Sequence, residues 1–103
     1  MRCFMKVSIP TDVGNAKMKD GSLPKTIQSI LAEQKPEAAY FYEENGKRTG
    51  AIFLDLADPS RIPAIAEPWF LAFHASVELH PAMTPDDLPK AGPAIEAAVN
   101  KYS

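Results

Sequence analysis

The most constraining feature of the sequence is an Asn-Gly pair, Asn45-Gly46, between two runs of β-favouring residues within residues 36–56. This arrangement is the strongest short-range signal for a β-hairpin, because both residues tolerate the positive φ angles of a type I′ turn. A two-residue turn also fixes the pairing of the strands and places Glu43 opposite Arg48 as an opposite-charge pair. The sequence therefore predicts a hairpin of defined register, and such a hairpin belongs to a sheet.

The register assigns the side chains of the hairpin to two faces, because side chains alternate along a strand. Tyr42 should lie opposite Thr49, and Tyr40 opposite Ala51. One face is apolar and consists of Ala39, Phe41, Ile52, Leu54 and Leu56. The other face is mixed and consists of Tyr40, Tyr42, Thr49, Ala51, Phe53 and Asp55. A slip of one residue would exchange these two faces.

The rest of the chain predicts two further strands and three helices. Residues 2–9 and the segment from Ala75 to His80 alternate as strands do. Apolar residues recur at helical spacing in residues 23–35, with Ser22 as the N-cap, and again in residues 94–102. Helical pattern also covers residues 59–74, where we expect a break at Glu67-Pro68. A capping-box pattern at residues 84–87 opens the last helix.

Residues 11–21 collect turn-forming residues and predict a long loop between the first strand and the first helix. A loop of about eleven residues is longer than most connections in compact domains. Long loops often contact ligands, and Asn15, Lys17 and Lys19 are the side chains that would do so here. A surface excursion without function is the simpler interpretation.

The predicted order of elements is that of a ferredoxin-like βαββαβ domain of the α+β class, with an extra C-terminal helix. With 103 residues the chain has room for one domain, which we expect to span residues 1–103. Both crossover helices must cover the same, apolar face of the sheet, which bears Met5, Val7, Phe41, Ile52, Leu54, Val77 and Leu79. The open face would then present Phe4, Lys6, Ser8, Tyr40, Tyr42, Thr49, Ala51, Phe53, Asp55, Ser76, Glu78 and His80.

Composition argues against several classes of function. The formal net charge is −2, so no positive field would attract nucleic acid or an acidic membrane surface. The one cysteine, Cys3, rules out an intrachain disulfide, and its predicted place on the covered face makes it a small inert hydrophobe. His74 and His80 lack metal-binding spacing, so we expect no metal. No apolar run resembles a signal sequence or a membrane span, and we expect a cytoplasmic protein.

The open face holds the candidate site residues. His80 and Glu78 lie two residues apart on one strand face and are the candidate catalytic acid and base. Tyr40 and Tyr42 could position a carbonyl or phenol ligand, although tyrosines also favour dimer interfaces. The remaining candidate ligand-binding residues are Lys6, Ser8, Phe53 and Asp55, of which Lys6 and Asp55 could pair across the sheet or meet a partner chain.

The strand patterns Phe4-Lys6-Ser8, Tyr40-Tyr42 and Ser76-Glu78-His80, with the helix that contains Trp69-Phe70, resemble the dimeric α/β-barrel superfamily. The stretches GNAKMKDGSLPKTI and DPSRIPAIAEPWF are similar to short bacterial members without an assigned activity. The resemblance implies a homodimer in which two ferredoxin-like domains press their open sheet faces together. Members include antibiotic-biosynthesis and haem-degrading monooxygenases and muconolactone isomerases.

Haem-degrading relatives use an Asn, a Trp and an iron-binding His together. This chain has Trp69, but His74 follows it by only five residues, and Ser8 stands where an Asn is needed. We therefore expect no haem and no other cofactor, and Trp69 is interpreted as a core residue.

Two functional hypotheses follow. The first is a homodimeric small-molecule binding or accessory module that uses the open sheet face. The second is a cofactor-independent, monooxygenase- or isomerase-like enzyme that acts on a small aromatic or carbonyl substrate with His80, Glu78 and the tyrosines. The first is favoured, because no trio of titratable groups converges in the sequence.

Overall fold

The predicted hairpin is present in the computed structural model, which describes residues 1–103. It joins β2 (Ala38–Glu44) to β3 (Lys47–Asp55). Asn45 and Gly46 have φ angles of 54° and 76°, as a type I′ turn requires. The register is confirmed: the paired residues are Tyr40 and Ala51, Tyr42 and Thr49, Glu43 and Arg48, and Glu44 and Lys47.

The sheet has four strands in the order β2-β3-β1-β4, with β1 spanning Arg2–Ser8 and β4 spanning Ser76–Pro81. All neighbouring strands are antiparallel. β1 and β2 are separated by β3, and β3 and β4 are separated by β1, so each crossover connects two strands across a third. This is the ferredoxin-like order, and the predicted fold class is confirmed.

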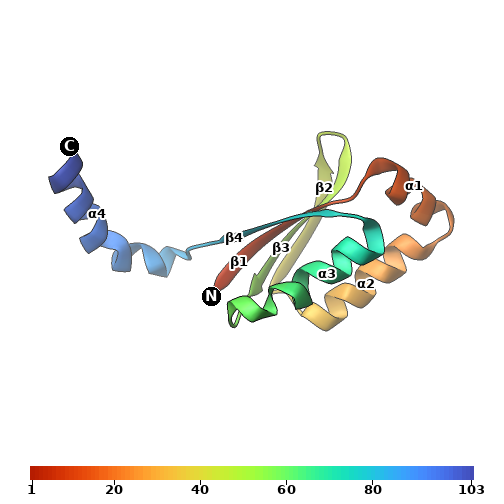
Figure 1. The fold of residues 1–103 in the computed structure, drawn as a ribbon, viewed down its shortest axis with the longest axis horizontal. Coiled ribbons are helices and arrows are strands. Elements are labelled where there is room, and N and C mark those ends of the chain that lie inside the picture. The colour runs from red at the N-terminus through yellow and green to blue at the C-terminus, as the bar shows by residue number, and fades with distance from the viewer.

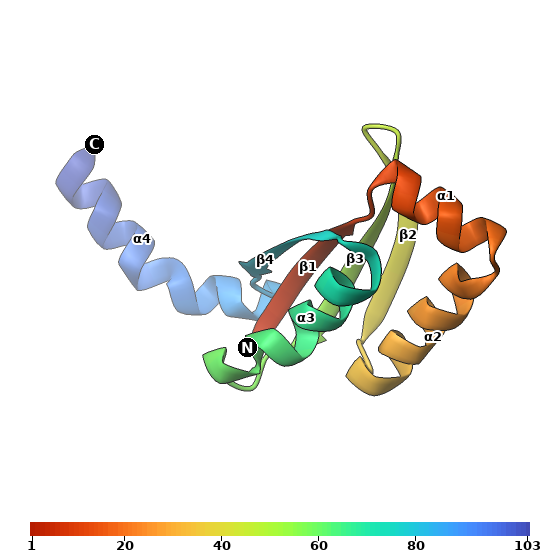
Figure 2. The same ribbon diagram turned by 45° about the vertical axis from the view of Figure 1, so that its right-hand side comes forward.

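Two helices, α2 (Ser22–Gln34) and α3 (Ile62–Phe73), lie against the same side of the sheet (Figure 2). Burial alternates strictly along β1, where Cys3, Met5 and Val7 face the helices and are buried. Trp69 and Phe73 from α3 are fully buried against them. The hydrophobic core therefore lies where the sequence places it, between the predicted apolar face and the two helices.

The long loop predicted for residues 11–21 is wrong, because Thr11–Lys19 form a helix, α1. Asp12 in its first turn and Lys19 in its last turn suit the helix dipole. Gly14 suggested a turn, since glycine in a helix interior costs about 1 kcal/mol relative to alanine. Here Gly14 is buried, and an added Cβ would come within 2.7 Å of the Arg48 side chain, so the glycine makes room for a neighbouring side chain.

Ser22 is not the N-cap of α2, although the sequence predicts it in that role. Gly21, at a φ of 82°, occupies the cap position, and Ser22 lies in the first turn. The Oδ1 atom of Asp20 accepts a hydrogen bond from the Ser22 backbone N–H at 2.8 Å, which satisfies a free amide of that turn. The side chain that binds a free amide of the first turn is therefore Asp20, two residues before the predicted cap, Ser22.

The predicted break at Glu67-Pro68 is also absent. A short 3₁₀ turn, η1 (Pro59–Arg61), leads directly into α3, and α3 continues through Pro68. At Pro68 the helix loses the hydrogen bond to the carbonyl four residues earlier, that of Ala64, and the proline ring crowds the same carbonyl. Ala64 is exposed, so water can satisfy this carbonyl.

The C-terminal helix, α4 (Leu88–Tyr102), projects away from the sheet and from the other helices (Figure 1). The predicted capping box is present at Thr84 and Asp87, in the 3₁₀ turn η2 (Pro85–Asp87) that precedes α4. No residue of α4 is buried, and the predicted apolar stripe is exposed. The radius of gyration is consequently 17.2 Å, against about 13 Å for a compact domain of this length.

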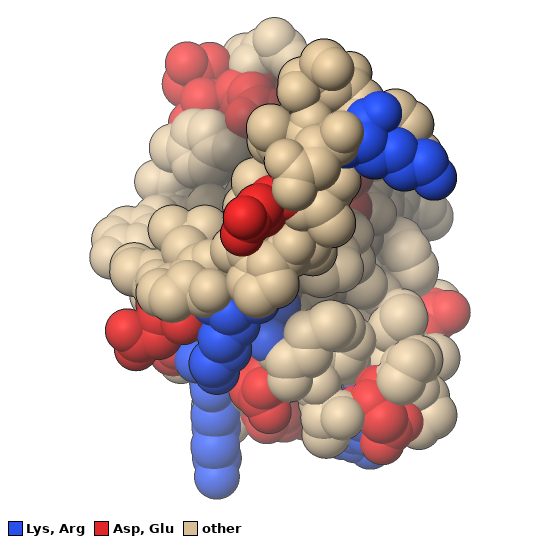
Figure 3. Space-filling view, turned by 90° about the vertical axis from the view of Figure 1, so that its left-hand side faces the viewer, with Lys and Arg blue, Asp and Glu red and all other residues tan.

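The end of the molecule from which α4 projects is largely uncharged, with acidic and basic side chains scattered around it (Figure 3). None of the helices combines the length and the apolar character needed to cross a membrane.

Candidate functional site

The sheet face turned away from α2 and α3, called the open face below, carries all the site residues that the sequence predicts. Register places them in rows across β2, β3, β1 and β4. The first row is Ala38, Phe53, Phe4 and His80; the second is Tyr40, Ala51, Lys6 and Glu78; the third is Tyr42, Thr49, Ser8 and Ser76. Asp55 pairs with Arg2 beyond the first row. Their shared face is thus established, whereas their roles stay predictions.

Lys6 is the centre of a polar network on this face. Its Nζ atom lies 2.8 Å from Oε2 of Glu44 and 3.1 Å from Oε2 of Glu78. The Tyr42 hydroxyl donates a hydrogen bond to Oε1 of Glu44 at 2.9 Å. The two carboxylates raise the pKa of Lys6, through hydrogen bonds first to Glu44 and then to Glu78. Four side chains from β1, β2 and β4 are thereby held together.

Glu44 takes part in this network, although it is not among the site residues that the sequence predicts. The hydrogen bond from Lys6, and secondly the one from Tyr42, lowers the pKa of Glu44, while Glu44 raises the pKa of Tyr42. The signal that could have found Glu44 is its spacing, since it lies two residues after Tyr42 on the same strand face. It was missed because it adjoins the turn, where charged residues are usually solvated.

Thr49 is buried, with 3% of its surface exposed, although the sequence places it on the open face. Its row lies between that of Lys6 and the end of the hairpin that holds Glu44. The Lys6–Glu44 bridge therefore crosses above Thr49 and covers it. The Thr49 hydroxyl donates a hydrogen bond to the carbonyl of Lys47 at 3.0 Å, which satisfies this buried polar group.

An aromatic ladder forms the first row of the open face. The rings of Phe4 and Phe53 are stacked with centroids 5.1 Å apart, and the ring of His80 is stacked on Phe4 at 6.0 Å. The ladder joins β3, β1 and β4, and no helix covers it. It gives the open face an apolar end beside the polar network of Lys6.

His80 and Glu78, the candidate acid and base, have their Nε2 and Oε1 atoms 3.9 Å apart. Both side chains are more than half exposed. Because Glu78 also binds Lys6 through its other oxygen, the three groups form a line from Lys6 through Glu78 to His80. The arrangement could transfer a proton to a ligand on this face, but one of its carboxylate oxygens is already engaged.

The predicted pair of Lys6 and Asp55 is not formed. Asp55 lies at the end of β3, where its Oδ1 atom accepts a hydrogen bond from the amino group of Met1 at 2.8 Å, and this contact lowers its pKa. Ser8 lies two rows from His80, so the structure does not bring these two candidates together.

Neither of the two cavities of the structure is lined by Lys6, by His80 or by the phenylalanines of the aromatic ladder. One, of about 390 Å³, lies between α2 and the hairpin on the covered side of the sheet. The other, of about 260 Å³, lies between the end of α2, the end of β3 and α3. No group of three His, Cys, Asp or Glu side chains is arranged to hold a metal ion.

No protein-family model and no curated protein sequence matches the chain. Among solved structures, a formyltetrahydrofolate deformylase from Pseudomonas putida KT2440 is similar, with a TM-score of 0.48 and 14% sequence identity. The alignment covers 80% of this chain and 29% of that chain. A similarity this low carries no argument about function, and the ferredoxin-like fold is established here by the strand order and connections.

Proposed function

We propose that the protein is a homodimer of the dimeric α/β-barrel type, in which two open faces meet and form a small-molecule binding or accessory module. The observation that carries this proposal is a complete sheet face that no helix of the same chain covers. An antiparallel sheet can have one solvated face, but such a face is usually polar. This one carries stacked aromatic rings.

Exposure supports the same proposal. Tyr40 is 64% exposed and Tyr42 is 42% exposed on β2, next to the aromatic ladder. Tyrosine and phenylalanine are enriched at the centres of protein interfaces. The ammonium of Lys6 is paired with Glu44 and Glu78 within the chain, so a second sheet would not leave the lysine unpaired. The second carboxylate gives the cluster one excess negative charge, and Glu78 has its other oxygen 3.9 Å from His80.

The space between two such faces would suit a small aromatic or carbonyl compound. Aromatic rings would supply its apolar walls, and the Tyr42 hydroxyl and His80 would supply hydrogen bonds. We expect the ligand to be bound and not transformed, since Lys6, Glu44, Glu78 and Tyr42 are engaged with one another and leave His80 as the single candidate acid or base.

The enzyme hypothesis keeps one specific observation in its favour, which is the 3.9 Å separation of His80 and Glu78. A cofactor-independent isomerase or monooxygenase acting on a small aromatic or carbonyl substrate would use this pair as acid and base. If His80→Gln abolished turnover of such a compound and preserved its binding, the enzyme hypothesis would replace the module.

Light scattering of the purified protein at micromolar concentration tests the assembly. We expect a mass of twice the 11.2 kDa of the chain. Tyr40→Glu should give the monomer, because it would bury a charge between the sheets. Leu71→Glu is the matched control, since Leu71 is 79% exposed on α3 and lies on the other side of the sheet. A wild-type monomer would contradict the proposal, and so would equal effects of the two substitutions.

A further inference from the structure

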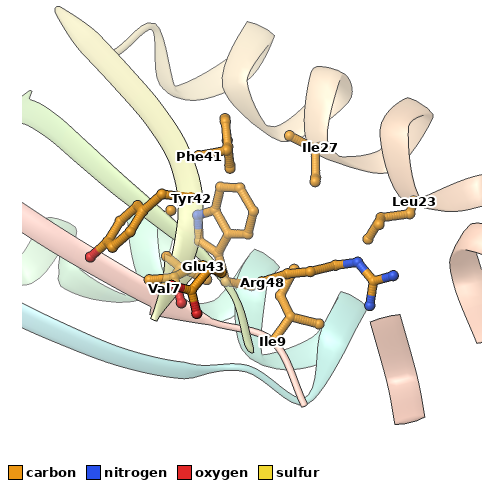
Figure 4. A pocket seen from close by; sticks show the side chains of 11 residues that line it. Val7, Ile9, Leu23, Ile27, Phe41, Tyr42, Glu43 and Arg48 are labelled. Atoms are coloured by element: carbon orange, nitrogen blue, oxygen red, sulfur yellow. The ribbon is translucent and has the colours of Figure 1, made fainter. Parts of the chain in front are cut away.

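The larger cavity lies on the covered side of the sheet, between α2 and the end of the hairpin (Figure 4). Ile27 and Leu23 project into it from α2, and Val7, Ile9 and the buried ring of Trp69 complete its apolar wall. Its volume of about 390 Å³ is within the range of small-molecule sites, which is about 300–1,000 Å³. Of the ligand-binding residues predicted from the sequence, only Tyr42 lines this cavity.

Phe41 lies at the edge of this cavity and is half exposed, although the sequence assigns it to the core face. Its ring covers Gly50 on the neighbouring strand, where an added Cβ would approach it to 3.0 Å. A large aromatic side chain that reaches water at the edge of an apolar cavity would gain further burial from a ligand.

Arg48 supplies a positive charge to the lining of the cavity. Its Nη1 atom donates a hydrogen bond to Oδ1 of Asn15 on α1 at 3.0 Å, and Gly14 leaves room for its guanidinium. The neutral amide of Asn15 orients the group without balancing its charge. None of the ion pairs of the structure includes Arg48.

Glu43 was predicted to pair with Arg48 across the hairpin, but this ion pair is absent. Oε2 of Glu43 instead accepts a hydrogen bond from the backbone N–H of Gly46 at 3.1 Å, within the turn. The Tyr42 ring and the Arg48 guanidinium point in opposite directions, so Tyr42 does not occupy the charged part of the cavity either (Figure 4). The donors of Arg48 that Asn15 does not engage are thus free for a ligand.

We propose that this cavity binds a small amphiphilic carboxylate, with an apolar body between α2 and the sheet and a carboxylate against Arg48. Arginine offers planar, paired donors that match the geometry of a carboxylate. Glu43 also lines the cavity, but its carboxylate accepts the hydrogen bond from Gly46 in the turn, so Arg48 is the charged group left to orient a ligand by a single polar end. Most of its lining lies on the covered side of the sheet, with Tyr42 and Thr49 as the two lining residues from the open-face rows, and all of it comes from one chain.

Trp69 makes the proposal directly testable, because it is the one tryptophan of the chain and lines the cavity. Titration with decanoate, below its micelle concentration, should change the fluorescence of Trp69 saturably. Decanol carries the same apolar chain without the charge and should bind about tenfold more weakly, since a charge-assisted hydrogen bond is lost.

Arg48→Gln should weaken decanoate binding about tenfold and leave decanol binding unchanged. Arg61→Gln is the matched control, because Arg61 precedes α3 and does not line this cavity. Absence of any Trp69 response to both compounds would overturn the proposal. Equal affinity of the wild-type protein for decanoate and decanol would also overturn it, and this comparison does not depend on the folding of a variant.

Discussion

Lys6 shows how single residues give the open face its properties. Its ammonium group lies between Glu44 and Glu78, so a face rich in aromatic rings also contains a cluster of one cation and two carboxylates. All three side chains are partly or largely accessible to solvent, which screens their interactions. Their contribution to stability should therefore be modest but dependent on pH.

Lys6→Gln should make the protein less sensitive to acid. The pKa of Glu44 is lowered in the folded chain, so its contribution to stability is present above the ordinary glutamate pKa and is lost as the pH falls through the lowered value. The raised pKa of Lys6 keeps the lysine charged throughout this range. Thermal unfolding between about pH 6 and pH 3 should show a smaller loss of stability for the variant than for the wild type.

Lys25→Gln is the control for this measurement, since Lys25 is exposed on α2 and forms no ion pair. It should reproduce the acid sensitivity of the wild type. If Lys6→Gln lost stability on acidification as steeply as the wild type, the Lys6 cluster would not be a source of the pH dependence.

At the scale of elements, α1 acts as the support of Arg48. Gly14→Ala should separate the contribution of α1 to stability from its positioning of Arg48. Alanine favours the helix by about 0.5–1 kcal/mol, but the new Cβ would displace the end of the Arg48 side chain and its bond to Asn15. Thermal unfolding should show no loss of stability, whereas fluorescence titration should show weaker decanoate binding. A loss of more than about 1 kcal/mol would mean that Gly14 is required by the backbone packing instead.

α4 should be the least protected helix in hydrogen exchange. It packs mainly against the turn η2 before it, and none of its residues is buried, whereas α3 carries four buried residues. An isolated helix of 15 residues is marginal in water, so its amides should exchange orders of magnitude faster than those of α3. Protection of α4 equal to that of α3 would contradict its exposed position.

Short-range sequence patterns predicted the elements whose structure depends on residues that are neighbours in the chain. The Asn45-Gly46 turn and the alternation of β1 were sufficient for the hairpin, the register and the two faces of the sheet. The helix α1 was missed because Gly14 and Asn15 favour turns. A glycine is suited to this helix because the Arg48 side chain, which β3 brings near, occupies the space of a Cβ. The continuity of α3 through Pro68 likewise depends on tertiary packing of its buried side.

The candidate site was partly predictable, because strand alternation assigns side chains to the two faces of the sheet. Strand alternation placed Lys6, Tyr42 and Glu78 on one face, but it could not show which of them touch. The Lys6–Glu44 contact depends on how long side chains cross the sheet. The cavity beside Arg48 was not predictable, because it results from how α2 lies against the hairpin and from the hydrogen bond by which Asn15 of α1 orients Arg48.

At the scale of the whole molecule, one observation governs the proposed function: the core lies on one side of the sheet, while aromatic side chains lie uncovered on the other. In the proposed homodimer, one symmetric contact would cover the open faces of both chains, and a two-fold symmetric dimer is the commonest oligomer. The covered-side cavity would then remain accessible in each protomer.

The most direct test of the homodimer is an NMR measurement of intermolecular contacts in a sample mixed from isotope-labelled and unlabelled chains. For the proposed homodimer, we expect intermolecular contacts between the rings of Phe4, Phe53, Tyr40 and Tyr42 and residues of the same face of the second chain. Intermolecular contacts confined to α4, or none at micromolar to millimolar concentration, would contradict it.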